Sequence, residues 1–184
     1  QVPHNIIIVE PGSSLHVITG CAVSPRCGSA AHVACTEIYV GEGAELTWTM
    51  IHNWGTGRGI HVRPRMGALV AEGGTLRINY VLLSPVRSIQ FYPTAILLGR
   101  GARVSFRNLM LALGSSDIDA GSAVIFNAPG TRGEITSRAI AKDEADIKMR
   151  GKLWARRPGV RGHLECRALL LGEAQASAYP ALQS

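Results

Sequence analysis

Apolar and polar positions alternate along this chain in a pattern that recurs every 28–31 residues. Each repeat begins at a turn glycine: Gly12, Gly43, Gly73, Gly101, Gly130 and Gly159. The fifth residue after each glycine is apolar: Val17, Trp48, Ile78, Phe106, Ile135 and Leu164. The fourth is polar: His16, Thr47, Arg77, Ser105, Glu134 and His163. Such alternation is typical of β-strands, because successive side chains point to opposite faces.

A second turn signal lies midway through several repeats, at Gly55-Thr56-Gly57, Gly114-Ser115-Ser116 and Lys142-Asp143-Glu144. Each repeat therefore holds about two strand segments and two turns, and none contains an amphipathic helix. We predict an all-β fold, a right-handed parallel β-helix of about six turns with little or no helix, forming a single domain over residues 1–184. A β-sandwich is the main alternative, but its strands are unevenly spaced and connected by hairpins.

The predicted interior rows contain the candidate chemistry. Positions 3, 5, 7 and 9 after each glycine should point inward. The seventh position is unusually polar, with Thr19, Met50, Tyr80, Asn108, Ser137 and Cys166. The ninth places Cys21 beside His52, and Trp54 follows two residues later. A simpler interpretation is that these small polar groups bond to one another and that the cysteines only fill space.

Charge and hydropathy exclude several classes of protein. The net charge is +6, and 17% of the residues are charged. Because the arginines form no dense run, we expect a solvated basic face and no nucleic-acid site. No apolar stretch approaches the ~20 residues that a membrane span requires. No signal peptide is apparent, and we expect a cytoplasmic protein with no membrane association.

The four cysteines, Cys21, Cys27, Cys35 and Cys166, indicate reduced thiols, because they are few and contain no Cys-x-x-Cys pair. Cys21 and Cys166 lie five repeats apart, about 24 Å at roughly 4.8 Å per strand, so they cannot form a disulfide with each other. Residues three apart in a strand face opposite ways, so neither His32-x-x-Cys35 nor His163-x-x-Cys166 should chelate one ion.

Ordered motifs along nearly the whole chain resemble the β-helix core of the SufB/SufD family of iron–sulfur cluster assembly proteins. These motifs are Gly20-Cys21, Asn53-Trp54, Tyr92-Pro93-Thr94-Ala95-Ile96-Leu97, Ala128-Pro129-Gly130-Thr131, Arg150-Gly151, His163-Leu164-Glu165-Cys166-Arg167-Ala168-Leu169-Leu170-Leu171 and Tyr179-Pro180. Cys166 makes the chain more similar to SufB, because SufD proteins usually lack this late cysteine. His52 stands where the family usually has glutamine, and Met149 stands where it has tyrosine.

The resemblance implies a scaffold for nascent iron–sulfur clusters, not an enzyme with a self-contained active site. It implies that Cys21 accepts sulfur, that His52 and Trp54 lie on the interior path of that sulfur, and that Cys166 binds the metal of a transient cluster. The implied partners are a SufC-like ATPase, a SufB- or SufD-like subunit or a second copy, and a sulfur donor protein. On this resemblance we expect residues 1–184 to be the β-helix core without the family's C-terminal helical segment, which docks the ATPase.

Two other functions remain open at this point. Many polysaccharide lyases and hydrolases are β-helices, but their chemistry requires clustered acidic or basic groups in a groove, and Asp117, Asp119, Asp143, Glu144 and Asp146 lie in or near turns. The other is an assembly module without cluster chemistry. Either scaffold or module should associate through a sheet edge or an open end of the β-helix.

Overall fold

The computed structural model describes residues 2–23, 28–54 and 59–184, which form strands and turns but no helix. One sheet has six strands: β2 (Ser14–Ala22), β5 (Glu45–Asn53), β8 (Thr75–Leu82), β11 (Arg103–Ala112), β13 (Arg132–Asp143) and β15 (Arg161–Gly172). The other has ten: β1 (His4–Val9), β3 (Ala30–His32), β4 (Cys35–Val40), β6 (Ile60–Val62), β7 (Arg65–Val70), β9 (Ser88–Phe91), β10 (Thr94–Leu97), β12 (Asp117–Phe126), β14 (Asp146–Ala155) and β16 (Gln175–Gln183). Across the described ranges, the structure contains no helix able to span a bilayer.

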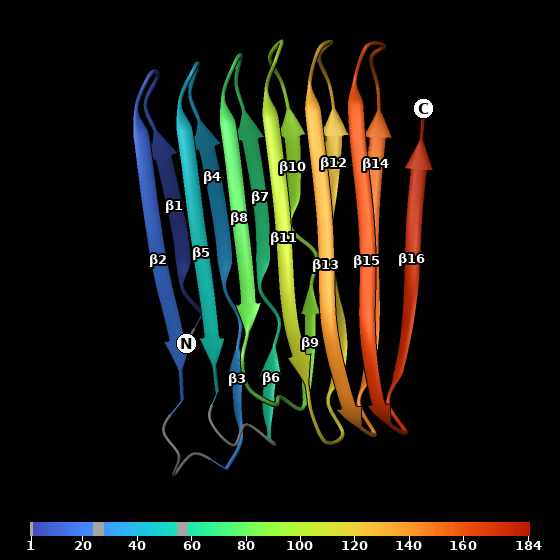
Figure 1. Ribbon diagram of the computed structural model, residues 1–184. Helices are drawn as coiled ribbons and strands as arrows, with labels where there is room; N and C mark the ends of the chain where they lie inside the picture. The colour runs from blue at the N-terminus through green and yellow to red at the C-terminus, as the bar shows by residue number, and fades with distance from the viewer. Residues whose placement is uncertain (1, 24–27, 55–58) are drawn as a thin grey trace.

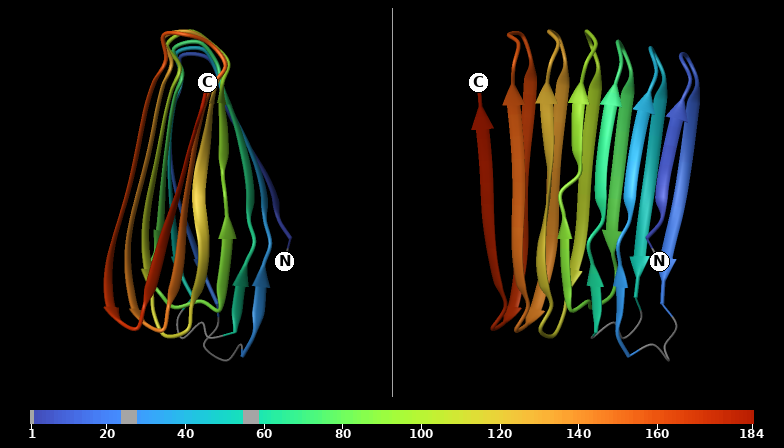
Figure 2. Two further views of the ribbon diagram at one scale, coloured as in Figure 1. Left: turned by 90° about the vertical axis from the view of Figure 1, so that its right-hand side faces the viewer. Right: turned by 180° about the vertical axis from the view of Figure 1, so that it is seen from behind.

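The two sheets are opposite walls of one coil of about six turns. In Figure 1 the chain runs down the six-stranded sheet, returns up the ten-stranded sheet behind it and advances from β1 to β16, which is a right-handed winding. Seen along the axis, the walls meet at the tight turns and separate toward the other end (Figure 2). All strand pairings are parallel, so the β-helix prediction is confirmed and the β-sandwich alternative is wrong.

The predicted turn glycines all adopt a left-handed backbone conformation, with φ between 59° at Gly43 and 72° at Gly130 and Gly159. Residues with a Cβ atom rarely adopt it. These turns stack on one another: Gly12 donates to the carbonyl of Glu42, and Gly43 to that of Glu72, both at 2.8 Å. The second set of turns also forms where expected, with positive φ at Gly114 and Asp143. The predicted turn at residues 55–57 lies outside the described residues.

The strand register confirms the predicted inward rows. Trp48, Ile78, Phe106 and Ile135 occupy successive strands at the fifth position after the glycine, and all four are buried. Residues of the same rows in the first and last coils are only half-buried, as in Val17 and Leu164, or exposed, as in Leu15 at 40%. Alternation therefore gave the direction of each side chain, and the coil's place in the stack decides how fully it is covered.

The ten-stranded wall is more broken than the alternation predicted. Two strand segments per repeat were expected, yet β6 and β7 are separated by Arg63-Pro64, and β9 and β10 by Tyr92-Pro93. Proline has no N–H to donate to the neighbouring strand, which interrupts regular pairing in these two coils. Val33-Ala34 separates β3 from β4 without a proline. In β12 the equivalent position holds Gly121-Ser122 and the strand continues. Position 121 requires glycine, because a Cβ there would lie 1.9 Å from the carbonyl oxygen of Arg150.

Candidate functional site

Cys21 and His52 lie next to each other inside the coil, as the sequence predicts. They are directly paired residues of β2 and β5, and both point toward the interior. Cys21 is a free, half-buried thiol, and His52 is buried. Trp54, which follows β5, is also buried. The pairing of β2 with β5 therefore positions the two groups that the repeat placed in one row.

His32 completes the cluster from the opposite wall. It ends β3 and is half-buried. One ligand atom each from Cys21, His32 and His52 lie within 4.8 Å of one another. Sequence reasoning rejected a His32–Cys35 chelate, and Cys35 is indeed exposed. The sequence assigned no role to His32, because its contact with Cys21 and His52 crosses the interior from one sheet to the other. The register within one sheet does not predict such a contact.

Aromatic rings enclose this Cys21–His32–His52 cluster. The ring centroid of Trp54 lies 5.3 Å from that of His32 and 5.1 Å from that of His52. The ring centroid of Tyr80 lies 5.1 Å from that of His52, and the Tyr80 hydroxyl is 3.2 Å from Nδ1 of His52. Nε1 of Trp54 is buried and has no hydrogen-bond partner among the described residues. Cys21, His32, His52, Trp54 and Tyr80 thus form one cluster of rings and polar groups inside the coil, which we call the chamber.

Burial keeps these groups uncharged near neutral pH. Burial, followed by the charge of protonated His32, lowers the pKa of His52 to about 4. Burial likewise lowers the pKa of His32 and raises that of the Cys21 thiol. Tyr80 is enclosed, and burial raises its pKa. At pH 7 the chamber therefore offers two neutral imidazoles, which are ligands and hydrogen-bond partners, and a protonated thiol.

A row of polar side chains leads from this chamber toward Cys166. Tyr80, Asn108, Ser137 and Cys166 are paired residues of successive strands, β8, β11, β13 and β15. Asn108 Nδ2 donates to Ser137 Oγ at 3.1 Å, and both residues are buried. Together with the contact between His52 and Tyr80, the row extends nearly the length of the coil, about 24 Å for five strand spacings.

Cys166 is at the other end of this row. It is a free, half-buried thiol in β15, the last strand of the six-stranded sheet. Burial, and to a smaller extent the charge of Glu165, raises its pKa. His163 is exposed beside Glu165 on the outer face, opposite to the inward row that contains Cys166.

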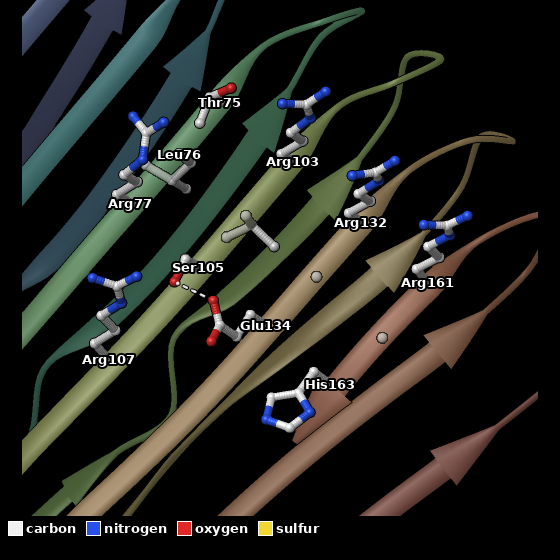
Figure 3. A pocket seen from close by; sticks show the side chains of 13 residues that line it. Thr75, Leu76, Arg77, Arg103, Ser105, Arg107, Arg132, Glu134, Arg161 and His163 are labelled. Atoms are coloured by element: carbon white, nitrogen blue, oxygen red, sulfur yellow. Dashed lines mark hydrogen bonds between the residues drawn. The ribbon is translucent and has the colours of Figure 1, made fainter. Parts of the chain in front are cut away.

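Arginine side chains line a shallow hollow of about 380 Å³ on the outer face of the six-stranded sheet (Figure 3). Arg103, Arg132 and Arg161 are paired residues of neighbouring strands, and none has an ion-pair partner within the described ranges. Glu134 lies below them and accepts a hydrogen bond from Ser105 at 3.3 Å. The hollow contains no thiol, and the strands separate it from the interior row. We therefore place the candidate chemistry inside the coil.

Comparison with known proteins identifies the family. A family model described as "SUF system FeS cluster assembly, SufBD core domain" matches residues 1–184. The chain belongs to the SufBD family of iron–sulfur cluster assembly proteins. Nothing in these matches assigns roles to Cys21, His52, Trp54 or Cys166, so the roles that the family resemblance implies stay predictions.

Several relatives are named iron–sulfur cluster assembly SufBD family protein. A homologue in Methanothermobacter thermautotrophicus (strain Winter) is 46% identical over 143 residues, 78% of this chain and 34% of the relative. A relative in Archaeoglobus fulgidus is 42% identical over 142 residues, which cover 77% of this chain and 37% of the relative. A relative in Staphylococcus aureus (strain MRSA252) is 32% identical over 143 residues, which cover 78% of this chain and 30% of the relative. The matched part of this SufBD core thus spans about a third of the relatives' length.

Proposed function

We propose that this SufBD core is a scaffold component of a SufBCD-type system, which accepts sulfur at Cys21 and builds a nascent iron–sulfur cluster at Cys166. The observation that carries this proposal is the interior polar row, because it joins two free thiols about 24 Å apart through the body of the coil. Buried polar residues are costly unless bonded, and apolar residues of similar size would fill the same space.

The first step is sulfur transfer to Cys21. Its thiolate attacks the terminal sulfur of a persulfide on a donor protein. A sulfur–sulfur bond forms on Cys21, the donor's sulfur–sulfur bond breaks, and the donor leaves as a thiolate, so no net oxidation occurs. Because burial raises the pKa of Cys21, docking of the donor must supply the base or charge that forms the thiolate.

The second step releases sulfide into the interior row. Two equivalents of a thiol reductant convert the Cys21 persulfide to a thiol and hydrogen sulfide, and are themselves oxidised to one disulfide. Tyr80, Asn108 and Ser137 offer hydroxyl and amide groups that can bond to a hydrosulfide as it moves. Since Asn108 and Ser137 bond to each other in the resting protein, passage requires that bond to open.

Cys166 provides the first ligand at the end of the route. A thiolate is the usual ligand of an iron–sulfur cluster, and a cluster requires further ligands besides one cysteine. A SufB- or SufD-like partner, or a second copy, supplies them in this proposal. The cluster is a transient product that is transferred to another protein. A SufC-like ATPase drives the conformational change that this cluster transfer requires. The scaffold works in the cytoplasm and is not itself an enzyme.

The test is anaerobic reconstitution with iron and sulfide of the chain assembled with its partners. We expect Cys166→Ser to remove the visible absorbance of the cluster, while Cys35→Ser, which changes an exposed cysteine, retains it. Cys27→Ser should also retain it, although Cys27 lies outside the described residues. If Cys166→Ser assembles clusters as well as the parent chain, the role of Cys166 is wrong and an assembly module without cluster chemistry becomes the better account.

A further inference from the structure

Three potential metal ligands converge in the chamber at the N-terminal part of the coil. Cys21 comes from β2, His52 from the adjacent β5, and His32 from β3 on the opposite wall. Their ligand atoms lie within 4.8 Å of one another. Around one zinc ion, ligand atoms at about 2.0–2.3 Å from the metal are roughly 3.5 Å apart. The three groups therefore need to move inward by only about an ångström to share one ion, which rotation of the half-buried His32 can supply.

The donor set selects the kind of metal. A thiolate and two imidazoles suit zinc, ferrous iron, cobalt or copper, whereas magnesium and calcium require oxygen ligands. No carboxylate belongs to the cluster. Three protein ligands leave one position of a tetrahedral ion open to an outside ligand such as water or sulfide.

Tyr80 acts on the cluster as a supporting residue. Its hydroxyl lies 3.2 Å from Nδ1 of His52, which leaves Nε2 as the free ring nitrogen for an ion. Metal-binding histidines typically have their second nitrogen held in this way, and such contacts orient the ring. The Trp54 ring packs beside both histidines and restricts access of water.

We propose that Cys21, His32 and His52 form a binding site for one zinc-class transition-metal ion, with the fourth position open. The site is separate from the proposed cluster position at Cys166, which lies about 24 Å away. Metal on Cys21 blocks its sulfur from attacking a persulfide, so the ion and incoming sulfur compete for the same atom.

The experiment titrates the reduced, chelator-treated chain with zinc in a calorimeter and with cobalt in a spectrophotometer. We expect one zinc ion per chain. Cobalt should give the intense near-ultraviolet band of a thiolate bound to cobalt. Cys21→Ser, His32→Gln and His52→Gln should each weaken binding by more than about a hundred-fold, because second-shell contacts alone contribute about 10–100-fold. Tyr80→Phe should weaken it about 10-fold.

Matched controls are Cys35→Ser and His163→Gln, which change exposed residues of the same types and should bind like the parent chain. Circular dichroism checks that each variant folds. A second measurement needs no variant: zinc should protect Cys21 from alkylation and leave Cys35 equally reactive. The proposal is overturned if zinc binds without stoichiometry, if the three ligand variants bind as the controls do, or if zinc leaves the alkylation of Cys21 unchanged. Cys166→Ser leaves this site intact, so a failure here is distinguishable from a failure of the proposed function.

Discussion

Single buried polar residues give the interior of this coil its chemical character. Asn108 and Ser137 bond to each other, and His52 bonds to Tyr80. A satisfied buried hydrogen bond contributes only about 1 kcal/mol to stability, so leucine or valine would serve the fold about equally well. Stability alone therefore does not account for a polar row along the axis, and we propose that the row serves the movement of sulfur.

The first prediction concerns the pH dependence of stability in the chelator-treated chain. His52 has a pKa of about 4 when folded, below the usual 6.5, and that of His32 is also lowered. The unfolded chain then binds more protons between these pH values, so stability is full above about pH 6.5 and declines as the pH falls toward 4. Protonation of His52 lowers the free energy of unfolding by at most about 3 kcal/mol. Denaturant unfolding from pH 8 to 4.5 measures it.

His52→Gln is the control, because glutamine does not titrate. The groups facing His52 are Cys21, His32 and Tyr80, and neither the thiol nor the phenol titrates in this range. The stability difference between the parent chain and His52→Gln should shrink as the pH falls. A difference that stays constant from pH 8 to 4.5 contradicts the account of a buried, neutral His52.

At the level of residues, the sequence predicted neighbours within a sheet better than neighbours across the coil. Cys21 beside His52 followed from counting from two glycines, as did Cys166 beside Ser137. His32 was missed because its distance from Cys21 depends on how the two walls are spaced, and no repeat encodes that spacing.

At the level of elements, the turn glycines carry the repeat. The φ angle of Gly73 is 62°, which is strained for alanine. A Cβ at this position would be 3.8 Å from the nearest atom, so alanine would cause no steric clash. We expect Gly73→Ala to lower the free energy of unfolding by about 1 kcal/mol. Gly67→Ala in β7 is the matched control, because its φ is ordinary and its Cβ would be in open space. Equal effects of the two changes in denaturant melts would count against this role of the turns.

The stacked arginines give a second prediction for the elements. Arg132 lies between Arg103 and Arg161 on neighbouring strands. Like charges directly opposite one another destabilise a sheet by about 0.2–1 kcal/mol, and salt screens them. Arg132→Gln should therefore raise the melting temperature at low salt, and the gain should fade as salt is added. Arg77→Gln breaks an ion pair with Glu45 at 3.1 Å and should not raise it. No gain from Arg132→Gln at low salt would mean that the arginines do not repel appreciably.

The interruptions in the ten-stranded sheet show what a repeat alone cannot predict. Pro64 and Pro93 lie in successive coils and each separates two strand segments, although the register aligns Pro64 with Phe91. Alternation of apolar residues continues through these places, so the sequence pattern predicted one strand where two form. The glycine spacing, by contrast, gave every turn at the narrow end of the coil.

On the scale of the whole molecule, the coil places one thiol toward each end of a single interior row. The intervening strands separate Cys21 from Cys166 by about 24 Å, so direct contact between them is impossible. The central claim is that sulfur crosses this distance inside the protein. A substitution in the middle of the row should block it without touching either cysteine.

Isotopic channelling tests that claim most directly. In the chain assembled with its partners, Cys21 is loaded with labelled persulfide sulfur, and iron, a thiol reductant and excess unlabelled sulfide are then added. We predict that label enters the cluster of the parent chain despite the excess, and that Asn108→Leu assembles clusters made of unlabelled sulfide. Asn79→Leu, the same change on the outer face of β8, should behave like the parent chain. Label diluted to the ratio of the bulk solution in the parent chain, or equal labelling in Asn108→Leu, would contradict transfer through the interior.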